Sequence, residues 1–103
     1  MALRGKQKSF LRSEAHHLNP VVQIGKNGLS ETLLDQVDEL LERRELIKVT
    51  LLQYTDEEAS EVEEVFETTL HCHVVQTIGR ILVVYRPSSK EKYQKISQQV
   101  RSI

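Results

Sequence analysis

The sequence predicts a single α/β domain with a four-stranded mixed sheet. Its 103 residues, with 39% hydrophobic and 28% charged side chains and only four glycines and two prolines, are typical of one folded domain. Amphipathic segments alternate with short apolar runs, so the expected order of elements is α-β-α-β-α-β-β. The first two strands are far enough apart for a parallel crossover, which should be right-handed, and the last two are close enough for a hairpin. Together these two connections predict a mixed sheet.

The first part of the chain predicts a helix, a strand, a glycine loop and a second helix. Apolar residues recur at helical spacing from residue 5 to about 17, and Asn19-Pro20 ends this helix because the residue before a proline disfavours helical geometry. The apolar run 21–24 is expected to be a strand. A strongly amphipathic helix follows over about 30–44, with Ser30 placed to cap its first turn.

The middle of the chain predicts one more strand and an acidic helix. Along 46–52, Ile47, Val49 and Leu51 alternate with other residues, which places them on one face of a strand. Apolar residues at helical spacing then predict a helix from Asp56 to about residue 70, whose many glutamates form a solvated outer face.

Two apolar runs close the predicted domain. The runs 74–78 and 81–85 are joined by Gly79-Arg80, which is typical of a hairpin. The second run is apolar on both faces, and this favours a central strand covered by helices. The domain is expected to span residues 1–87, and residues 88–103 to form a basic, polar C-terminal tail that is partly disordered or helical.

The net charge of −1 hides a strong asymmetry along the chain. Residues 1–28 carry five Lys/Arg and one acid, residues 29–70 carry three Lys/Arg and thirteen acids, and residues 71–103 carry six Lys/Arg and one acid. Two basic ends around an acidic middle indicate one surface suited to a polyanion and another that repels it. A plainer explanation is that the charged residues only solvate the outer faces of helices. This explanation accounts for the acids in the middle of the chain better than for the two ends, which are almost free of acid.

The stretch around which the chain is organised is Gly25-Lys26-Asn27-Gly28, between the first strand and the second helix. Glycines let a bound backbone approach closely, and a lysine beside a helix N-terminus is suited to hold phosphate. Taken alone, four residues of this kind fit a tight strand-to-helix turn better than a phosphate site.

Several longer motifs in collinear order give the loop its context. The chain resembles the bacterial YhbY-type family, a stand-alone CRM domain (chloroplast RNA splicing and ribosome maturation), over residues 3–87. The resemblance is carried by the basic first helix and three runs: Leu-Asn-Pro-Val-Val-Gln-Ile-Gly-Lys-Asn-Gly-Leu-Ser, Arg-Arg-Glu-Leu-Ile-Lys-Val and Gln-Thr-Ile-Gly-Arg-Ile-Leu-Val-Val-Tyr-Arg-Pro. It implies a fold similar to the C-terminal domain of initiation factor three, and a GxxG loop that contacts RNA as in KH domains. It also implies association with precursors of the large ribosomal subunit. The very acidic middle helices of this chain exclude a broad basic surface. They limit the expected RNA contact to the loop, the first helix and the last strand.

The expected RNA-binding residues fall into three groups. The loop is expected to contact phosphate through Lys26 and Asn27 and through the backbone N–H groups of Gly28 and Leu29. On the first helix the candidates are basic side chains that could equally be solvated. Basic residues at the hairpin and at the end of the last strand would position RNA without reading its sequence. The full set is Gly25, Lys26, Asn27, Gly28, Lys6, Lys8, Arg12, Arg80 and Arg86.

Two other groups of residues suggest a metal site or base stacking, but neither function is favoured. His71-Cys72-His73 invites a metal interpretation, but alternate residues of a strand face opposite sides and the chain offers no second pair of ligands, so no metal site is expected. Tyr54 and Tyr85 end strands, where packing at the sheet edge is favoured over stacking on a base.

The leading functional hypothesis is a non-enzymatic protein that binds structured ribosomal RNA during assembly of the large (50S) subunit. No nucleophile with its base, metal cluster or phosphate-binding Walker loop can be assembled, so neither a cofactor nor a small-molecule substrate is expected. The alternative is an adaptor whose acidic helices 30–44 and 57–70 dock a basic ribosomal protein. We expect a cytoplasmic protein without a membrane span, because the chain has one cysteine, no signal-like N-terminus and no long apolar run. A monomer is the expected state, although the sequence does not determine it.

Overall fold

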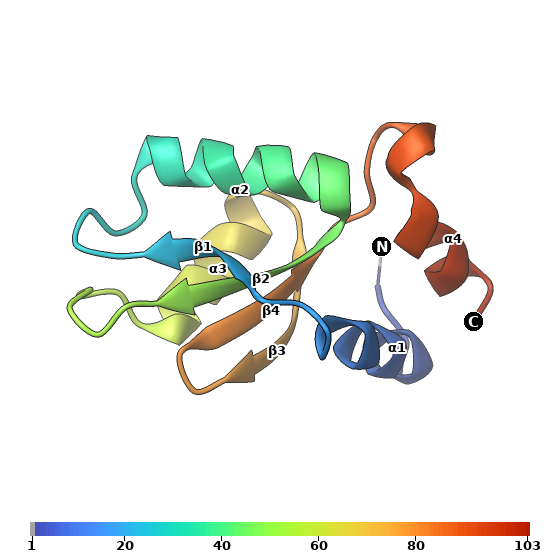
Figure 1. Ribbon diagram of the computed structural model, residues 1–103, viewed down its shortest axis with the longest axis horizontal. Coiled ribbons are helices and arrows are strands. Elements are labelled where there is room, and N and C mark those ends of the chain that lie inside the picture. Colours follow the sequence, from blue (N-terminus) through green and yellow to red (C-terminus); the bar gives the residue numbers. More distant parts are fainter. Residues whose placement is uncertain (1) are drawn as a thin grey trace.

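The computed structural model describes residues 2–103, and it confirms the predicted four-stranded mixed sheet (Figure 1). The strands lie in the order β1-β2-β4-β3; β1 pairs with β2 in parallel, and both other pairs are antiparallel. In chain order the elements are α1 (Gly5–Ala15), β1 (Pro20–Ile24), α2 (Glu31–Arg44), β2 (Leu46–Leu51), α3 (Ala59–Thr69), β3 (His73–Ile78), β4 (Ile81–Tyr85), the 3-10 helix η1 (Glu91–Tyr93) and α4 (Lys95–Arg101).

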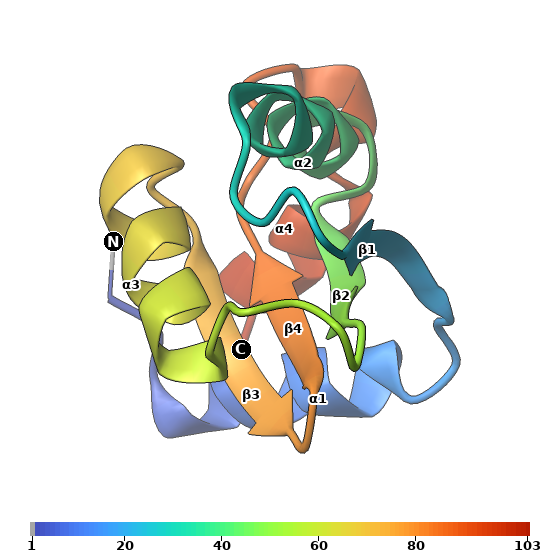
Figure 2. The same ribbon diagram turned by 90° about the vertical axis from the view of Figure 1, so that its left-hand side faces the viewer.

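One face of the sheet is covered by α2 and α3 (Figure 2). Ile47, Val49 and Leu51 of β2 all point to this side, as their alternation predicts, and pack in one buried cluster with Val37 of α2 and Phe66 of α3. The apolar stripes of both helices are thereby removed from water, which is the main favourable term in holding them on the sheet.

The other face of the sheet carries α1 and α4. A second buried cluster joins Leu11 of α1 and Val100 of α4 to Leu46, Val83 and Tyr85 of the sheet. Strand β4 therefore contributes buried residues to both faces, which confirms its prediction as a central, covered strand.

The segment after residue 87, predicted as a tail that is partly disordered or helical, contains η1 and α4 and is packed onto the domain. Val100 is fully buried, and the Gln7 side-chain amide donates to its carbonyl oxygen at 3.0 Å. Ser97, also buried, lies 2.7 Å from Tyr85 Oη through its hydroxyl oxygen. Only Ser97 and Val100 of the short helix α4 are buried, so most residues of this segment can be polar. A sequence with so few buried positions looks the same as that of a solvated tail.

Helix α3 begins at Ala59, three residues after the predicted start at Asp56. The Thr55 hydroxyl accepts a hydrogen bond from the Glu57 backbone N–H at 3.3 Å, and Glu58 is extended, with φ −104° and ψ 147°. This local turn competes with the first turn of the helix.

Three connections gather at one end of the molecule (Figures 1 and 2). They are the loop between β1 and α2, the loop between β2 and α3, and the hairpin tip at Gly79-Arg80. The Leu52 N–H donates to the Ile24 carbonyl at 2.9 Å, and Arg80 donates to the carbonyl oxygens of Leu51 at 3.1 Å and Leu52 at 2.7 Å. These bonds tie the three connections into one surface. Within residues 2–103, no helix has both the length and the apolar character that a membrane span requires.

Candidate nucleic-acid interface

The Gly25–Gly28 loop is a tight turn between β1 and α2. The Gly28 N–H donates to the Gly25 carbonyl at 3.1 Å, and Gly28 has a φ of +60°, which a glycine adopts without strain. Lys26 and Asn27 occupy the two middle positions and are exposed. The turn therefore presents a cation and an amide at its tip. The Gly28 N–H is already used inside the turn, so it is not the free phosphate donor that the sequence suggested.

The two glycines of the loop are needed for different reasons. A Cβ atom on Gly25 would lie 3.3 Å from Cε2 of Tyr54 and 3.4 Å from Cδ1 of Leu52. A Cβ atom on Gly28 would lie 2.6 Å from a carboxyl oxygen of Glu57, in addition to the strain of its positive φ. Gly25 thus leaves room for the loop that follows β2. Gly28 adopts the positive φ that the turn requires and also leaves room for an acidic side chain.

Helix α2 starts directly behind this loop. The Ser30 hydroxyl oxygen accepts a hydrogen bond from the Leu33 N–H at 3.1 Å, which confirms Ser30 as the N-cap. A depression of about 400 Å³ lies between the loop and the first turns of the helix, lined by Gln23, Gly25, Lys26, Asn27, Gly28, Ser30, Thr32, Leu33, Gln36 and Tyr54. The positive end of the α2 dipole and Lys26 thus border the same depression, an arrangement that suits an anion.

Arg80 belongs to the hairpin tip between β3 and β4, which lies at the same end of the molecule as the loop (Figure 1). Its hydrogen bonds to the Leu51 and Leu52 carbonyls fix the guanidinium beside the β2–α3 loop, while the residue remains exposed. The structure therefore brings Arg80 together with Lys26 and Asn27 as a second cation on this surface.

The basic residues of α1 form a separate group. Lys6, Lys8 and Arg12 are all exposed, and Arg12 Nε donates to the Val75 carbonyl at 3.0 Å. Helix α1 packs at the other end of the sheet from the Gly25–Gly28 loop (Figure 1). An RNA that contacts both groups must extend along the molecule.

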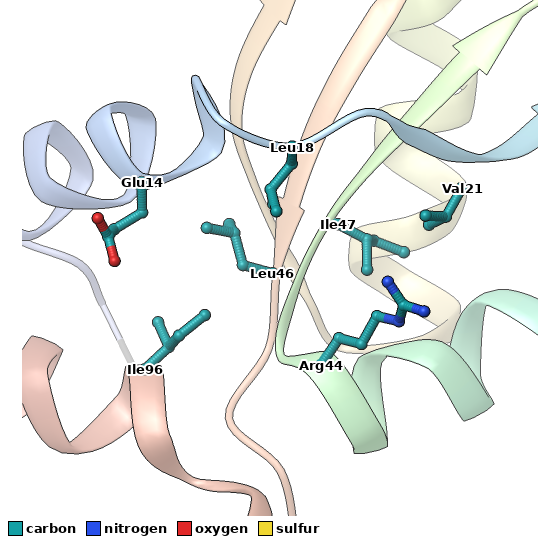
Figure 3. Close-up of a pocket in the computed structure, with 7 residues that line it drawn as sticks. All are labelled: Glu14, Leu18, Val21, Arg44, Leu46, Ile47 and Ile96. Atoms are coloured by element: carbon teal, nitrogen blue, oxygen red, sulfur yellow. The ribbon is translucent and has the colours of Figure 1, made fainter.

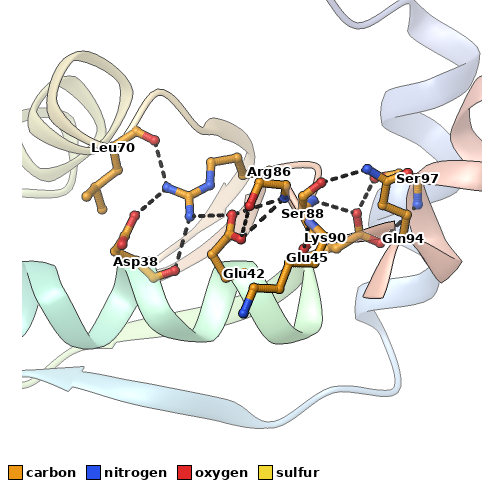
Figure 4. A network of polar contacts seen from close by, with 10 residues as sticks. Asp38, Glu42, Glu45, Leu70, Arg86, Ser88, Lys90, Gln94 and Ser97 are labelled. Carbon is orange, nitrogen blue, oxygen red and sulfur yellow. Dashed lines mark hydrogen bonds and ion pairs between the residues drawn. The ribbon is translucent and has the colours of Figure 1, made fainter. Parts of the chain in front are cut away.

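Arg86 has a structural role in the folded protein (Figure 4). Its side chain is only 14% exposed, and its guanidinium bonds Asp38 at 2.7 Å, Glu42 at 3.3 Å and the Leu70 carbonyl at 3.0 Å. These contacts join β4 to α2 and to the end of α3. We therefore leave Arg86 out of the proposed RNA-binding surface.

The His71-Cys72-His73 run is divided among different surroundings. Cys72 is buried, with Sγ 3.4 Å from the Phe66 carbonyl, and burial raises the pKa of its thiol to about 12. His73 stacks on Tyr85, with ring centroids 6.3 Å apart, whereas His71 is exposed. Within residues 2–103, no three His, Cys, Asp or Glu side chains are grouped as metal ligands.

An apolar hollow of about 290 Å³ is bordered by α1, α4, the end of α2 and the strands β1 and β2 (Figure 3). Its lining residues are Glu14, Leu18, Val21, Arg44, Leu46, Ile47 and Ile96. None of them belongs to the predicted RNA-binding set, so we do not include the hollow in the candidate interface.

Sequence reasoning did not place Tyr54, which it had weighed for stacking on a base, beside the loop, and it did not single out Glu57. Both lie in the segment between β2 and α3, almost thirty residues away along the chain, and touch the loop only through the pairing of β1 with β2. The sequence carries a weak signal for Tyr54, an aromatic residue in a polar segment after a strand. It carries no signal for Glu57, one acid among many.

Comparison with known proteins places these features in a family. The sequence signature of the CRS1/YhbY (CRM) domain matches residues 3–86. The chain is 47% identical over 90 residues to the protein named "Probable RNA-binding protein YqeI" of Bacillus subtilis, covering 87% of this chain and 94% of that protein. It is 45% identical over 92 residues to a protein named "RNA-binding protein" of Haemophilus influenzae, covering 89% and 93%. The solution structure of SAV1595 from Staphylococcus aureus is similar, with a TM-score of 0.73 and 42% identity over 91% of this chain and 98% of that one. The chain therefore belongs to the CRS1/YhbY (CRM) domain family.

Proposed function

We propose that this protein binds structured ribosomal RNA without catalysing a reaction, and that it acts in assembly of the large ribosomal subunit in the cytoplasm. The observation that carries the proposal is the position of Lys26 and Asn27, exposed at the tip of a tight turn in front of the α2 N-terminus. Arg80 adds a second cation at the same end. The names of two relatives support RNA as the partner, and the ribosomal target follows from the family resemblance.

The distribution of charge supports RNA contact at the loop end and on α1. Helices α2 and α3 carry most of the acids, while the basic residues Lys6, Lys8 and Arg12 lie on α1, on the opposite face of the sheet. Phosphate would be attracted to the loop end and to α1 and repelled from α2 and α3. Contacts of this kind hold RNA by its backbone and shape rather than by its sequence.

The adaptor alternative would use the acidic faces of α2 and α3 to dock a basic protein. Part of this charge is occupied, because Asp38 and Glu42 of α2 pair with Arg86 of the same chain. RNA affinity that depends strongly on salt distinguishes the two functions, since each phosphate contact contributes to the salt slope.

The experiment that tests the proposal removes Lys26 and Asn27 together. Lys26→Ala with Asn27→Ala should melt like the parent protein, because both side chains are exposed. Loss of the charge-assisted phosphate contact should cost roughly 1.5–3 kcal/mol, about ten- to a hundredfold in affinity, and lower the salt slope by about one. A matched control is Lys95→Ala with Gln98→Ala, which removes one cation and one amide from exposed positions of α4. If the loop variant and the control bind a structured RNA equally well, the loop is not a phosphate site.

A further inference from the structure

Tyr54 is unusual among the large apolar side chains of residues 2–103 because it is exposed. Tyr54 is 66% exposed, and among the large apolar residues of 2–103 only Ile78, in the hairpin, is also exposed. Tyr85, which ends β4, is fully buried, as packing at the sheet predicts. Tyr54 therefore departs from the expectation of packing, and its position needs another explanation.

The backbone around Tyr54 is held in place from several sides. The Leu52 N–H donates to the Ile24 carbonyl at 2.9 Å, and the Thr55 N–H donates to the Leu52 carbonyl at 3.1 Å. The Arg80 guanidinium also donates to the Leu52 carbonyl, at 2.7 Å. The backbone that carries the ring therefore loses little freedom when a ligand binds, which favours affinity.

The ring lies directly against the GxxG loop. A Cβ atom on Gly25 would be 3.3 Å from Tyr54 Cε2 and 3.5 Å from Tyr54 Oη, so the ring lies close to the loop backbone and a side chain at this position would crowd it. Tyr54 also lines the same depression as Lys26, Asn27 and Ser30. An aromatic surface thus adjoins the position where the loop would hold phosphate.

We propose that Tyr54 stacks on an unpaired nucleobase of the RNA whose phosphate is held at Lys26. The base and the phosphate of a nucleotide are joined through one ribose, so the two contacts can serve adjacent parts of one strand. Aromatic side chains stack on any base but need it unpaired, because the base faces inside an A-form duplex are covered by neighbouring pairs. The inference therefore names the preferred class of RNA as one with a loop, bulge or single-stranded end at this site.

This inference rests on the proposed function, and two RNA probes separate the two. The first probe is an RNA hairpin with an unpaired uridine loop, and the second is a fully paired duplex with the same stem. Tyr54→Leu should weaken hairpin binding by about fivefold to a hundredfold, from a stacking contribution of about 1–3 kcal/mol, and leave duplex binding unchanged. Tyr54→Phe, which keeps the ring, should bind both probes like the parent.

The pattern across variants identifies which idea fails. If Lys26→Ala with Asn27→Ala weakens hairpin binding and Tyr54→Leu does not, stacking is overturned and the phosphate site stands. If Tyr54→Leu weakens hairpin and duplex equally, the ring is not reading unpaired bases and stacking is again overturned. If the lysine and asparagine variant binds both probes normally, the proposed phosphate site fails.

A spectroscopic experiment observes the stacking directly. The chain has no tryptophan, so a Tyr54→Trp variant carries one indole at a known position. Hairpin RNA should quench its fluorescence, because the base would stack on the indole. A Tyr93→Trp variant is the control, since Tyr93 is the last residue of η1, which directly precedes α4 at the end of the molecule away from the loop. Equal quenching of the two variants, or no quenching of Tyr54→Trp by RNA that is bound, would overturn the proposal.

Discussion

The carboxyl group of Glu45 accepts two hydrogen bonds from Ser97, one from the backbone N–H at 3.1 Å and one from the hydroxyl. Glu45 connects α2 to β2 and is fully buried, with a φ of 65°. Its carboxyl oxygens also accept from the backbone N–H groups of Ser88 at 2.8 Å and Ile96 at 3.1 Å. The glutamate thereby caps the N-terminus of α4 from another part of the chain (Figure 4).

Replacing this group should destabilise the protein. Glu45→Gln keeps the size of the side chain, but its amide nitrogen cannot accept from the N–H groups that face it, so we expect a loss of about 2–3 kcal/mol of unfolding free energy. Urea denaturation measures the loss. Glu39→Gln, at an exposed position of α2, is the matched control and should change stability by less than about 0.5 kcal/mol. Equal midpoints for both variants would show that the buried bonds contribute little.

Arg86→Ala should destabilise the fold and leave RNA contact intact. The substitution removes the ion pairs to Asp38 and Glu42 and the bond to the Leu70 carbonyl, at a cost of roughly 2–3 kcal/mol. At a temperature where the variant is folded, its affinity for structured RNA should match that of the parent. Arg80→Ala is the informative comparison, because it removes an exposed cation near the loop. A variant at Arg86 that is stable but binds RNA poorly would restore this residue to the binding surface.

Glu57→Gln should tighten RNA binding. The Glu57 carboxyl group lies against Gly28, where its negative charge opposes a phosphate at the loop. The control Glu64→Gln removes the same charge from an exposed position further along α3. Filter-binding titrations at low salt should show a larger gain for Glu57→Gln. A loss of affinity in that variant would instead indicate that Glu57 helps to position the loop.

Acid should weaken the fold through His73. Burial lowers the pKa of this histidine below its ordinary value of 6.5, so between pH 6.5 and the lower folded value the unfolded chain binds more protons than the native protein. Stability should therefore fall as the pH drops through 6.5. The variant His73→Phe, which keeps an aromatic ring beside Tyr85, should show a smaller fall between pH 7.5 and about 5.5, measured by thermal melting. An identical pH profile in the two proteins would contradict this assignment.

The thiol of Cys72 should be protected from alkylation while the protein is folded. Burial raises its pKa to about 12, and the thiolate is the reactive form. We expect iodoacetamide to modify it only in denaturant, as followed by mass spectrometry. Rapid modification of the folded protein at pH 8 would show that the segment between α3 and β3 opens readily.

The elements that could be predicted from sequence are those set by local patterns. Alternation identified the buried face of β2, residues apolar on both faces identified β4 as central, and Ser30 marked the start of α2. Each of these features depends on residues close together in the chain, so periodicity and capping rules suffice to find them.

The features that escaped prediction depend on contacts between distant parts of the chain. Glu45 is one of fifteen acidic residues, and nothing beside it in sequence shows that its partners are Ser88 and Ser97. Arg86 ends a strand as a basic residue, and only the packing of α2 against the sheet shows that it is paired. The same holds for Tyr54, whose exposure beside Gly25 follows from the pairing of β1 with β2.

The gathering of three connections at one end has a practical consequence. The start of α1 and the helix α4 lie toward the opposite end of the molecule (Figure 1). A fusion partner or an immobilising tag joined at either terminus should therefore stand clear of Lys26, Tyr54 and Arg80. The protein can be tethered to a sensor surface by both routes, and agreement between the two orientations would show that neither attachment obstructs the loop.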